Sequence, residues 1–374
     1  MANIVSFCVL IVLSSLCFSK AQHVKVYELK RGYFSAKFTN YGATMLSVIL
    51  PDKAGKLDDV VLGYDLVNDY KNDTTYFGAI VGRVANRIGG AKFILNGVTY
   101  KTDANDGKNT LHGGSKGFSD VIWTVKSYKK HSHVTFSYES FDGEEGISTL
   151  NFKIVAKKIK NFLLNYAGFP GNLSVSVTYM LLHKNKLAVK MMAKPLNKPT
   201  PVNLALHTYW NLGGHNSGDI MSHTLKLFGS KITPVDSELI PTGEIVPVRK
   251  TPYDFRRPRE IGSKFDQLPH GYDINYVLHK SRRSRHLRKV AVVVESKCGR
   301  KMELWTNMPG VQFYTSNMLK NEKGKNGTVY GKHAGFCLET QGFPDAVNHP
   351  NFPSQIVKPR GIYKHFMVYR FTAH

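Results

Sequence analysis

The chain contains many short segments in which apolar and polar residues alternate, and clusters of turn residues separate them. A period of two places successive side chains on opposite faces of an extended strand, and convincing amphipathic helices with a period of 3.6 are scarce. Many short strands of this kind are typical of an antiparallel β-sandwich or barrel. We therefore predict an all-β fold, with strands at 24–30, 44–50, 133–140, 173–182, 186–194, 289–296 and 367–371.

With 374 residues the chain is long enough for one large all-β domain. No internal repeat or Pro/Ser-rich linker divides it, so we expect a single domain over residues 22–374. The apolar run from Ile4 to Phe18 is too short for a comfortable membrane span, and no later segment approaches one. We interpret residues 1–21 as a secretory signal peptide and expect a secreted, extracellular protein.

Export would allow disulfide formation between cysteines and N-glycosylation of asparagines. Cys298 and Cys337 remain after removal of the signal peptide, and either one disulfide or two buried free thiols would fit. Possible N-glycosylation sequons begin at Asn72, Asn172 and Asn326.

The formal net charge is +24, from 51 basic and 27 acidic residues, which suggests nucleic acid as a first partner. However, the lysines are scattered, the only dense cluster is at 280–289, and no nucleic-acid-binding signature accompanies it. We expect no nucleic-acid partner, and at most a weak attraction to acidic polysaccharide or membrane surfaces.

One carboxylate stands in an apolar segment near the end of the chain. Glu339 follows Phe336, Cys337 and Leu338. A buried charge is costly unless it is paired, and a shifted pKa is the usual consequence. Simple alternation would instead point Glu339 at water on the outer face of a sheet. On this segment alone the second account is favoured.

Other short runs place polar side chains beside glycines or aromatic residues. Taken singly, each has an ordinary explanation as a hydrogen-bonded core residue, a surface ion pair or a turn cap. Taken together, groups that bond hydroxyls and lie near aromatic faces are what a sugar site requires. The candidates are Asn86, Arg87, His112, His207, Tyr209, Asp273, Gln312 and Glu339.

A metal site is less well supported by the sequence. No HExxH run exists, and the only HxH pair is His131 with His133. Lys129 and Lys130 precede this pair and disfavour a cation there. We expect no metal and no cofactor.

A set of motifs resembles the aldose 1-epimerase (galactose mutarotase) family. They follow the family's order and cover nearly the whole chain after the signal peptide: GRVANRI, NTLHGG, DGEEG, PVNLALHTYWNLGG, IPTGEIVPV, GVQFYTSN and GFCLETQGFPDAVNHP. The resemblance implies a large two-sheet antiparallel β-sandwich in one domain. It also implies an isomerase that interconverts the α and β anomers of free aldohexoses, galactose or glucose, without cofactor or metal.

By the family's pattern, Glu339 would take the proton of the C1 hydroxyl and His207 would protonate the ring oxygen. After rotation about the C1–C2 bond, the roles reverse and the ring closes on the other face. Burial would raise the pKa of Glu339, and nearby carboxylates would keep His207 charged. The side chains that would hold the sugar are Asn86, Arg87, His112, Tyr209, Asp273 and Gln312.

The chain departs from the family's pattern in three places. Leu206 stands where an amide residue often precedes the catalytic His, and Ile274 stands where His commonly follows Asp273. These two changes put fine substrate preference in doubt. Residues 147–168 form an insertion between DGEEG and FPG, rich in Lys, Asn, Ile, Leu and Phe. We hypothesise that this insertion is an intron read through in a gene model.

Two alternative functions stay open. A sugar-binding sandwich without turnover would be favoured if Glu339 or His207 were replaced, and neither is. A mutarotase for hexose phosphates receives weak support from the high positive charge.

Overall fold

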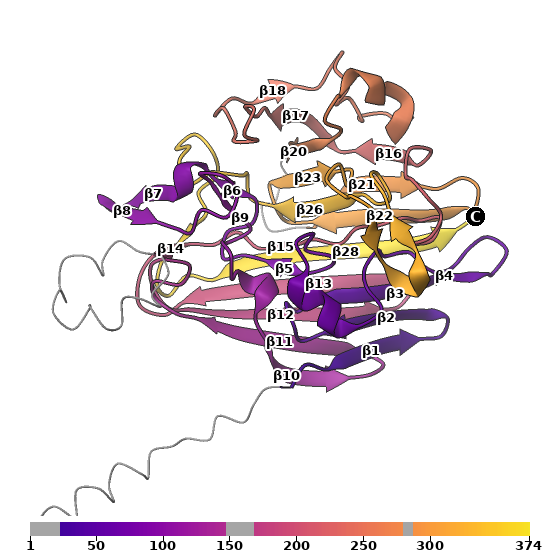
Figure 1. Cartoon of the computed structure of the whole chain (residues 1–374), viewed down its shortest axis with the longest axis horizontal. Helices are drawn as coiled ribbons and strands as arrows, with labels where there is room; N and C mark the ends of the chain where they lie inside the picture. Colours follow the sequence, from indigo (N-terminus) through magenta and orange to yellow (C-terminus); the bar gives the residue numbers. More distant parts are fainter. Residues whose placement is uncertain (1–22, 147–167, 280–286) are drawn as a thin grey trace, which may run out of the picture.

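The computed structural model describes residues 23–146, 168–279 and 287–374 (Figure 1). The predicted signal peptide, all of the insertion except Gly168, and most of the basic cluster at 280–289 lie outside the described residues. The all-β prediction is confirmed, and the helical segments of the described part are short 3-10 turns. No helix in that part is long and apolar enough to cross a membrane.

The largest sheet has nine antiparallel strands and runs from β10 near the bottom of Figure 1 to β16 near the top. In β12 the burial alternates strictly, which is why the sequence pattern identified this strand well. In spatial order, the strands are β10 (Thr124–Lys129), β11 (His133–Ser140), β12 (Leu173–Leu182), β13 (Lys186–Pro195), β28 (Tyr363–Ala373), β22 (Arg300–Thr306), β21 (Arg288–Val294), β16 (Thr224–Leu227) and β19 (Arg259–Glu260).

A five-stranded and a four-stranded antiparallel sheet complete the main framework. The five-stranded sheet has the order β18 (Val246–Pro247), β17 (Gly229–Thr233), β20 (Asp273–Leu278), β23 (Gly310–Tyr314) and β26 (Cys337–Gln341). The four-stranded sheet contains β1 (Val26–Arg31), β2 (Phe34–Thr39), β3 (Met45–Pro51) and β4 (Leu57–Asp59). All the strand segments predicted from the sequence coincide with observed strands, within a few residues at their ends.

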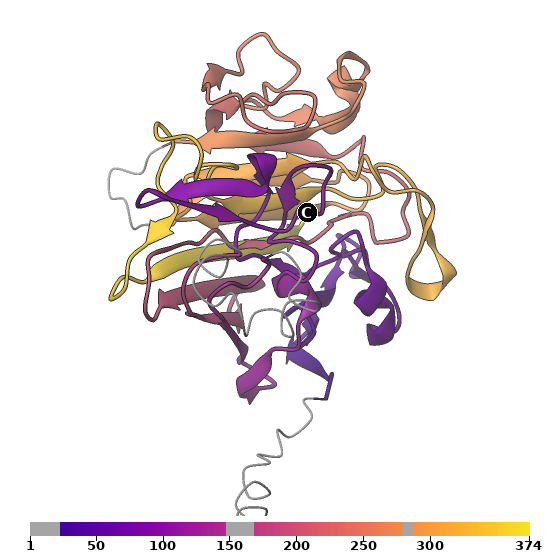
Figure 2. The same cartoon turned by 60° about the vertical axis from the view of Figure 1, so that its left-hand side comes forward.

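Pairs of short strands lie in the connections between these sheets, and some of them border the candidate site. Figure 2 shows the β7–β8 pair in purple and the segment around β17 and β20 in salmon at the top of the molecule. The pairs are β5 (Ile80–Val81) with β15 (Ala205–Leu206), β6 (Arg87–Ile88) with β9 (Thr110–Leu111), β7 (Lys92–Leu95) with β8 (Val98–Lys101), β14 (Thr200–Pro201) with β27 (Ile356–Val357), and β24 (Glu322–Lys323) with β25 (Val329–Tyr330).

The main core includes inward-facing side chains of both the nine-stranded and the five-stranded sheet. Leu338 of β26 and Phe313 of β23 are register partners, and both belong to the same buried cluster as Val177 and Val189 of the large sheet. Because successive side chains of a strand point to opposite faces, their neighbours Gln312 and Glu339 point away from this core. The functional side chains therefore lie on the far face of the five-stranded sheet.

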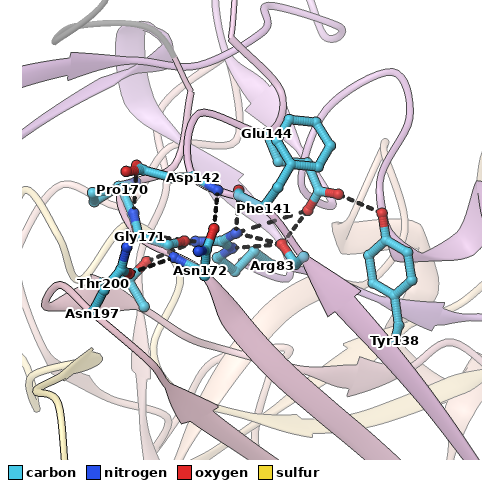
Figure 3. A network of polar contacts seen from close by, with 11 residues as sticks. Arg83, Tyr138, Phe141, Asp142, Glu144, Pro170, Gly171, Asn172, Asn197 and Thr200 are labelled. Atoms are coloured by element: carbon cyan, nitrogen blue, oxygen red, sulfur yellow. Dashed lines mark hydrogen bonds and ion pairs between the residues drawn. The ribbon is translucent and has the colours of Figure 1, made fainter. Parts of the chain in front are cut away.

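A cluster of buried polar groups around Arg83 connects several loops (Figure 3). The side chain of Arg83 is 1 % exposed and donates to the carbonyls of Phe141, Pro170 and Gly171 at 2.9–3.0 Å. It also donates to the hydroxyls of Ser140 and Thr200. Burial lowers the pKa of Arg83 only to about 10, so the guanidinium remains charged at neutral pH. This cluster fixes the loop beneath Asn86 and Arg87.

Candidate active site

Three strands of the five-stranded sheet supply the floor of the candidate site. Glu339 on β26 and Gln312 on β23 are register partners, and Asn275 of β20 pairs in turn with Gln312. Asp273, at the start of β20, has its carboxylate joined to Gln312, because the Gln312 amide Nε2 donates to Asp273 Oδ1 at 2.6 Å. The sheet therefore holds two carboxylates and an amide on one face.

Two loops and one short strand supply the wall. His207 directly follows β15, and its backbone N–H and C=O bond Ala79 and Gly78 at 2.9 Å. Asn86 and Arg87 lie at the start of β6, and His112 follows its partner strand β9. These side chains and those of the floor line one cavity of about 220 Å³. All eight residues proposed from the sequence line it: Asn86, Arg87, His112, His207, Tyr209, Asp273, Gln312 and Glu339.

Glu339 is 2 % exposed, so the account in which it faces water on an outer sheet face is wrong. Neither face of this strand meets bulk solvent, because Leu338 packs in the main core and Glu339 faces the cavity. The Glu339 Oε1 lies 3.6 Å from His207 Nε2. The other oxygen, Oε2, is buried and has no hydrogen-bond partner among the described residues. A buried acceptor without a donor is costly, and a ligand hydroxyl would satisfy it.

The pKa values of this pair are shifted in opposite directions. Burial, with a smaller contribution from Asp273, raises the pKa of Glu339 well above its usual range, and Arg87 opposes the shift. Burial lowers the pKa of His207 to about 4. The expectation that nearby carboxylates keep His207 charged is therefore wrong. At 3.6 Å the carboxylate makes no proper hydrogen bond to the imidazole and does not offset its burial.

His112 presents a defined ring nitrogen to the cavity. The backbone N–H of Asn86 donates to Nδ1 of His112 at 3.2 Å. Because Nδ1 accepts this bond, the neutral ring carries its proton on Nε2 and can donate to a ligand oxygen. Burial lowers the pKa of His112 well below its usual value, which keeps the ring neutral.

The two loop residues that frame this contact have a strained backbone. Asn86 has φ +62° and His112 has φ +52°, in the left-handed region that non-glycine residues rarely occupy. Such conformations persist only where the surrounding structure holds them, and they concentrate at functional sites. The carboxylate of Asp106 accepts from Arg87 Nε at 2.7 Å and holds the guanidinium toward the cavity.

His112, His207 and Glu339 are close enough together to be considered as a metal site, with potential ligand atoms within 4.8 Å of one another. A metal ion at His112 would have to bind Nε2 through a lone pair. In the neutral ring the only lone pair is on Nδ1, where it accepts from Asn86, and Nε2 carries the proton. The three groups are therefore better suited to hydrogen bonds with a hydroxylated ligand. The HxH pair is separate from this site, since His133 bonds the Ser127 hydroxyl and His131 the Lys30 carbonyl.

Aromatic residues surround His207, and sequence reasoning identified only Tyr209 among them. The Tyr209 hydroxyl donates to the Thr75 carbonyl at 2.9 Å, so its ring, 5.1 Å from that of His207, supports the wall. Tyr76 was missed: its ring lies 4.7 Å from His112 and 5.9 Å from His207. A Tyr-Phe-Gly run is a weak signal alone, and only the fold brings Tyr76 to the pocket.

The two departures from the family's pattern do not reach the pocket. Leu206 and Ile274 are both buried in the main core and face away from the cavity. The doubt that they raised about substrate preference therefore has no structural basis. Cys298 and Cys337 are free, so the disulfide alternative is wrong. The Cys337 sulfur lies 3.8 Å from His207 Nδ1, behind the catalytic candidates.

Comparisons with known proteins agree with this geometry. Residues 25–370 match the family model described as aldose 1-epimerase. The chain is 39 % identical over 356 residues to a galactose mutarotase of Sus scrofa, covering 95 % of this chain and 96 % of that protein. It is 35 % identical over 343 residues to an aldose 1-epimerase of Haemophilus influenzae, with coverages of 90 % and 92 %. The solved structure of an aldose epimerase homologue from C. elegans is similar, with TM-score 0.83, 27 % identity, and coverages of 94 % and 99 %.

Proposed function

The chain belongs to the aldose 1-epimerase family, and we propose that it interconverts the α and β anomers of free aldohexoses, galactose and glucose, with Glu339 as base and His207 as acid. As a member of this family the protein is an isomerase. The proposal concerns its substrates and the roles of its residues.

The proposed reaction needs an ionised Glu339 and a doubly protonated His207, whereas burial favours the neutral form of both, so sugar binding must first move the carboxyl proton of Glu339 to the imidazole of His207. The C1 hydroxyl of the sugar then donates its proton to Glu339, and the ring oxygen accepts a proton from His207. The ring opens to the aldehyde as both protons move, rotation about C1–C2 exchanges the faces, and the reverse transfers close the ring. Donation from the sugar hydroxyl favours the ionised carboxylate and so offsets the effect of burial. His112, with its proton on Nε2, and Arg87 supply further donors to sugar oxygens.

The observation that carries the proposal is the unpartnered Oε2 of Glu339, buried beside His207 at the end of a polar cavity. Most buried polar groups are hydrogen-bonded, so an unpartnered carboxylate oxygen that faces a cavity calls for an explanation. Here one oxygen is left for a donor that the described residues do not provide, and an acid candidate lies 3.6 Å from the other oxygen.

The lining of the cavity bears on the hexose-phosphate alternative. The one cation that lines it is Arg87, already paired with Asp106, whereas Asp273, Glu322 and Glu339 supply three carboxyl groups, and burial already disfavours a negative charge at Asp273 and Glu339. This balance is unfavourable for a phosphate. A neutral sugar therefore fits better, and added inorganic phosphate is not expected to inhibit.

Polarimetry of freshly dissolved α-galactose and α-glucose tests the proposal. The protein should accelerate the approach to the anomeric equilibrium, and His207→Asn and Glu339→Gln should abolish the acceleration while galactose still binds by calorimetry. A folded protein that binds galactose without accelerating mutarotation would instead be a sugar-binding sandwich.

We also propose that residues 1–21 direct export. Asn172 and Asn326 are exposed, which suits glycan attachment, and the Asn72 side chain lies outside the described residues. Expression in a secreting eukaryotic cell, with N-terminal sequencing of the medium and of the cytosol, tests the export. A product that starts at Met1 and stays in the cytosol contradicts it.

A further inference from the structure

The outward face of the nine-stranded sheet is unusually basic over five neighbouring strands, β13, β28, β22, β21 and β16. On β13 the residues facing the core are apolar, including Leu187 and Met191. The alternate positions and their register partners on β28 face outward, and the charged ones there are all cationic: Lys186, Lys190, Lys194, Lys364 and Arg370.

The three strands beyond β28 continue the pattern. Lys301 on β22, Lys289 on β21 and Lys226 on β16 lie at outward positions in the same register. The five strands together contain a single carboxylate, Glu303. We call the outward side chains of these five strands the basic face.

Glu303 does not neutralise the basic face. Its side chain is only 3 % exposed, and it lies beneath three cations: Lys289 Nζ at 2.5 Å, Lys301 Nζ at 3.9 Å and the Arg370 guanidinium. The carboxylate therefore orders three basic side chains, which remain about a third or more exposed, and leaves an excess of positive charge.

An aromatic ring lies among these ordered cations. Lys289 Nζ is 5.2 Å and the Arg370 guanidinium carbon 5.7 Å from the centre of the Trp305 ring. Trp305 is half-buried at an outward position of β22, paired with Val368 of β28. Aromatic faces pack against the apolar side of sugar rings, and the flanking cations suit acidic groups on the same chain.

We propose that the basic face binds a linear anionic polysaccharide carrying carboxylate or sulfate groups. Outward side chains two positions apart are about 7 Å apart along a strand, and neighbouring strands are about 4.8 Å apart. These spacings are within about one Debye length at 0.1 M salt, so the lysines repel one another and a polyanion relieves the repulsion.

This surface is separate from the sugar cavity. The cavity lies on the far side of the five-stranded sheet, and the basic face on the opposite side of the core from it. A long polymer on the basic face thus leaves the cavity open. The inference does not rest on the proposed function, and urea unfolding serves as an independent measure of correct folding.

The test compares two triple variants of equal net charge. Lys190→Gln, Lys194→Gln and Lys364→Gln remove cations of the basic face and leave those that neutralise Glu303 in place. Lys71→Gln, Lys332→Gln and Lys358→Gln remove exposed lysines outside the nine-stranded sheet. Affinities for heparin and polygalacturonate are measured at several salt concentrations, with dextran as the neutral control and double-stranded DNA and phosphatidylserine vesicles as competing polyanions.

We expect wild-type protein to bind heparin or polygalacturonate but not dextran, and the basic-face variant to bind at least about tenfold more weakly. The slope of log K against log salt should fall by about one for each contacting lysine removed. The control variant should retain binding, and both variants should unfold in urea as the wild type does. Equal losses in the two variants, no binding by the wild type, or a stronger face-dependent affinity for DNA or vesicles would overturn the proposal.

Discussion

Arg83 and Arg87 are four residues apart in the sequence, yet they belong to two buried polar clusters with opposite properties. Around Arg83 all three guanidinium nitrogens donate to oxygens, and both oxygens of Glu144 accept, from Tyr138 and Ser140. At Glu339, one carboxylate oxygen has no hydrogen-bond partner within the described part of the chain. The first cluster is complete without a ligand, whereas the second is complete only with one.

The difference explains what each cluster contributes. A fully bonded buried network rigidifies the chain that it connects, and removing one partner leaves the others unsatisfied. A buried network with an unsatisfied group costs free energy in the protein without ligand, and a ligand that bonds this group removes the cost. Arg83 therefore holds the loop in place, and Arg87, on the same loop, faces the cavity.

The largest effect that we expect on activity follows from Glu339→Gln. Loss of the base should slow mutarotation by about 10² to 10⁴-fold. Stability should be kept, because the substitution removes a buried carboxylate of which one oxygen has no hydrogen-bond partner among the described residues. Polarimetry and urea unfolding of the same preparation measure both quantities. If Glu339→Gln lost much stability and kept its activity, the cluster around Glu339 would serve stability and not catalysis.

Arg83→Met should have the opposite signature. The change leaves Glu144 buried without its cation and several carbonyls without a donor, so the free energy of unfolding should fall by about 3–5 kcal/mol. Arg249→Met, at an exposed turn, is the matched control and should change it by less than about 0.5 kcal/mol. Urea unfolding measures the difference. If Arg83→Met matched the control, the completeness of its network would not matter for stability.

Asp273→Asn should alter the pH profile as well as the rate. Because Asp273 raises the pKa of Glu339, and the reaction needs the ionised carboxylate, activity is present at high pH and lost as pH falls through that raised pKa. The neutral amide should lower this pKa and move the acidic limb to lower pH. Loss of a charged hydrogen-bond acceptor should also reduce kcat/KM by about ten- to a hundredfold.

Glu322→Gln is the control for this pH effect. Glu322 also lines the cavity but does not contribute to the shift of the Glu339 pKa. Its acidic limb should match that of the wild type in stopped-flow or polarimetric assays at each pH. If the acidic limb of the pH–activity profile moved equally in both variants, it would depend on the general charge of the pocket and not on Asp273.

The strands were predictable from the sequence because a period of two is local, as in β12. The residue types and their neighbours were enough to name the cavity residues as candidates for a sugar site. Their individual roles came only from motif resemblance, since alternation alone put Glu339 in water. Arg83 could not be predicted, because its partners come from residues 140–144, 170–171 and Thr200, which only the fold brings together. The lowered pKa of His207 likewise depends on the depth of burial.

The smallest expected effect tests whether the Arg83 cluster is complete without the neighbouring insertion. Glu144 and Phe169 pair as an antiparallel bridge, and Arg83 binds Phe141 on one side of the insertion and Pro170 on the other. We therefore propose that residues 147–167 can be deleted, which leaves Glu145, Gly146 and Gly168 as a short loop.

Each halving of a flexible loop lowers its closure cost by about 0.6 kcal/mol, so this deletion should stabilise the protein by about 1–2 kcal/mol. A variant in which residues 147–167 are replaced by a Gly/Ser linker of equal length is the control, and it should match the original chain in activity and urea unfolding. Unfolding of both altered chains would make the insertion part of the fold, and the cluster would not be self-sufficient. Sequencing of the transcript completes the test, because the intron hypothesis requires that the dominant message lack these codons.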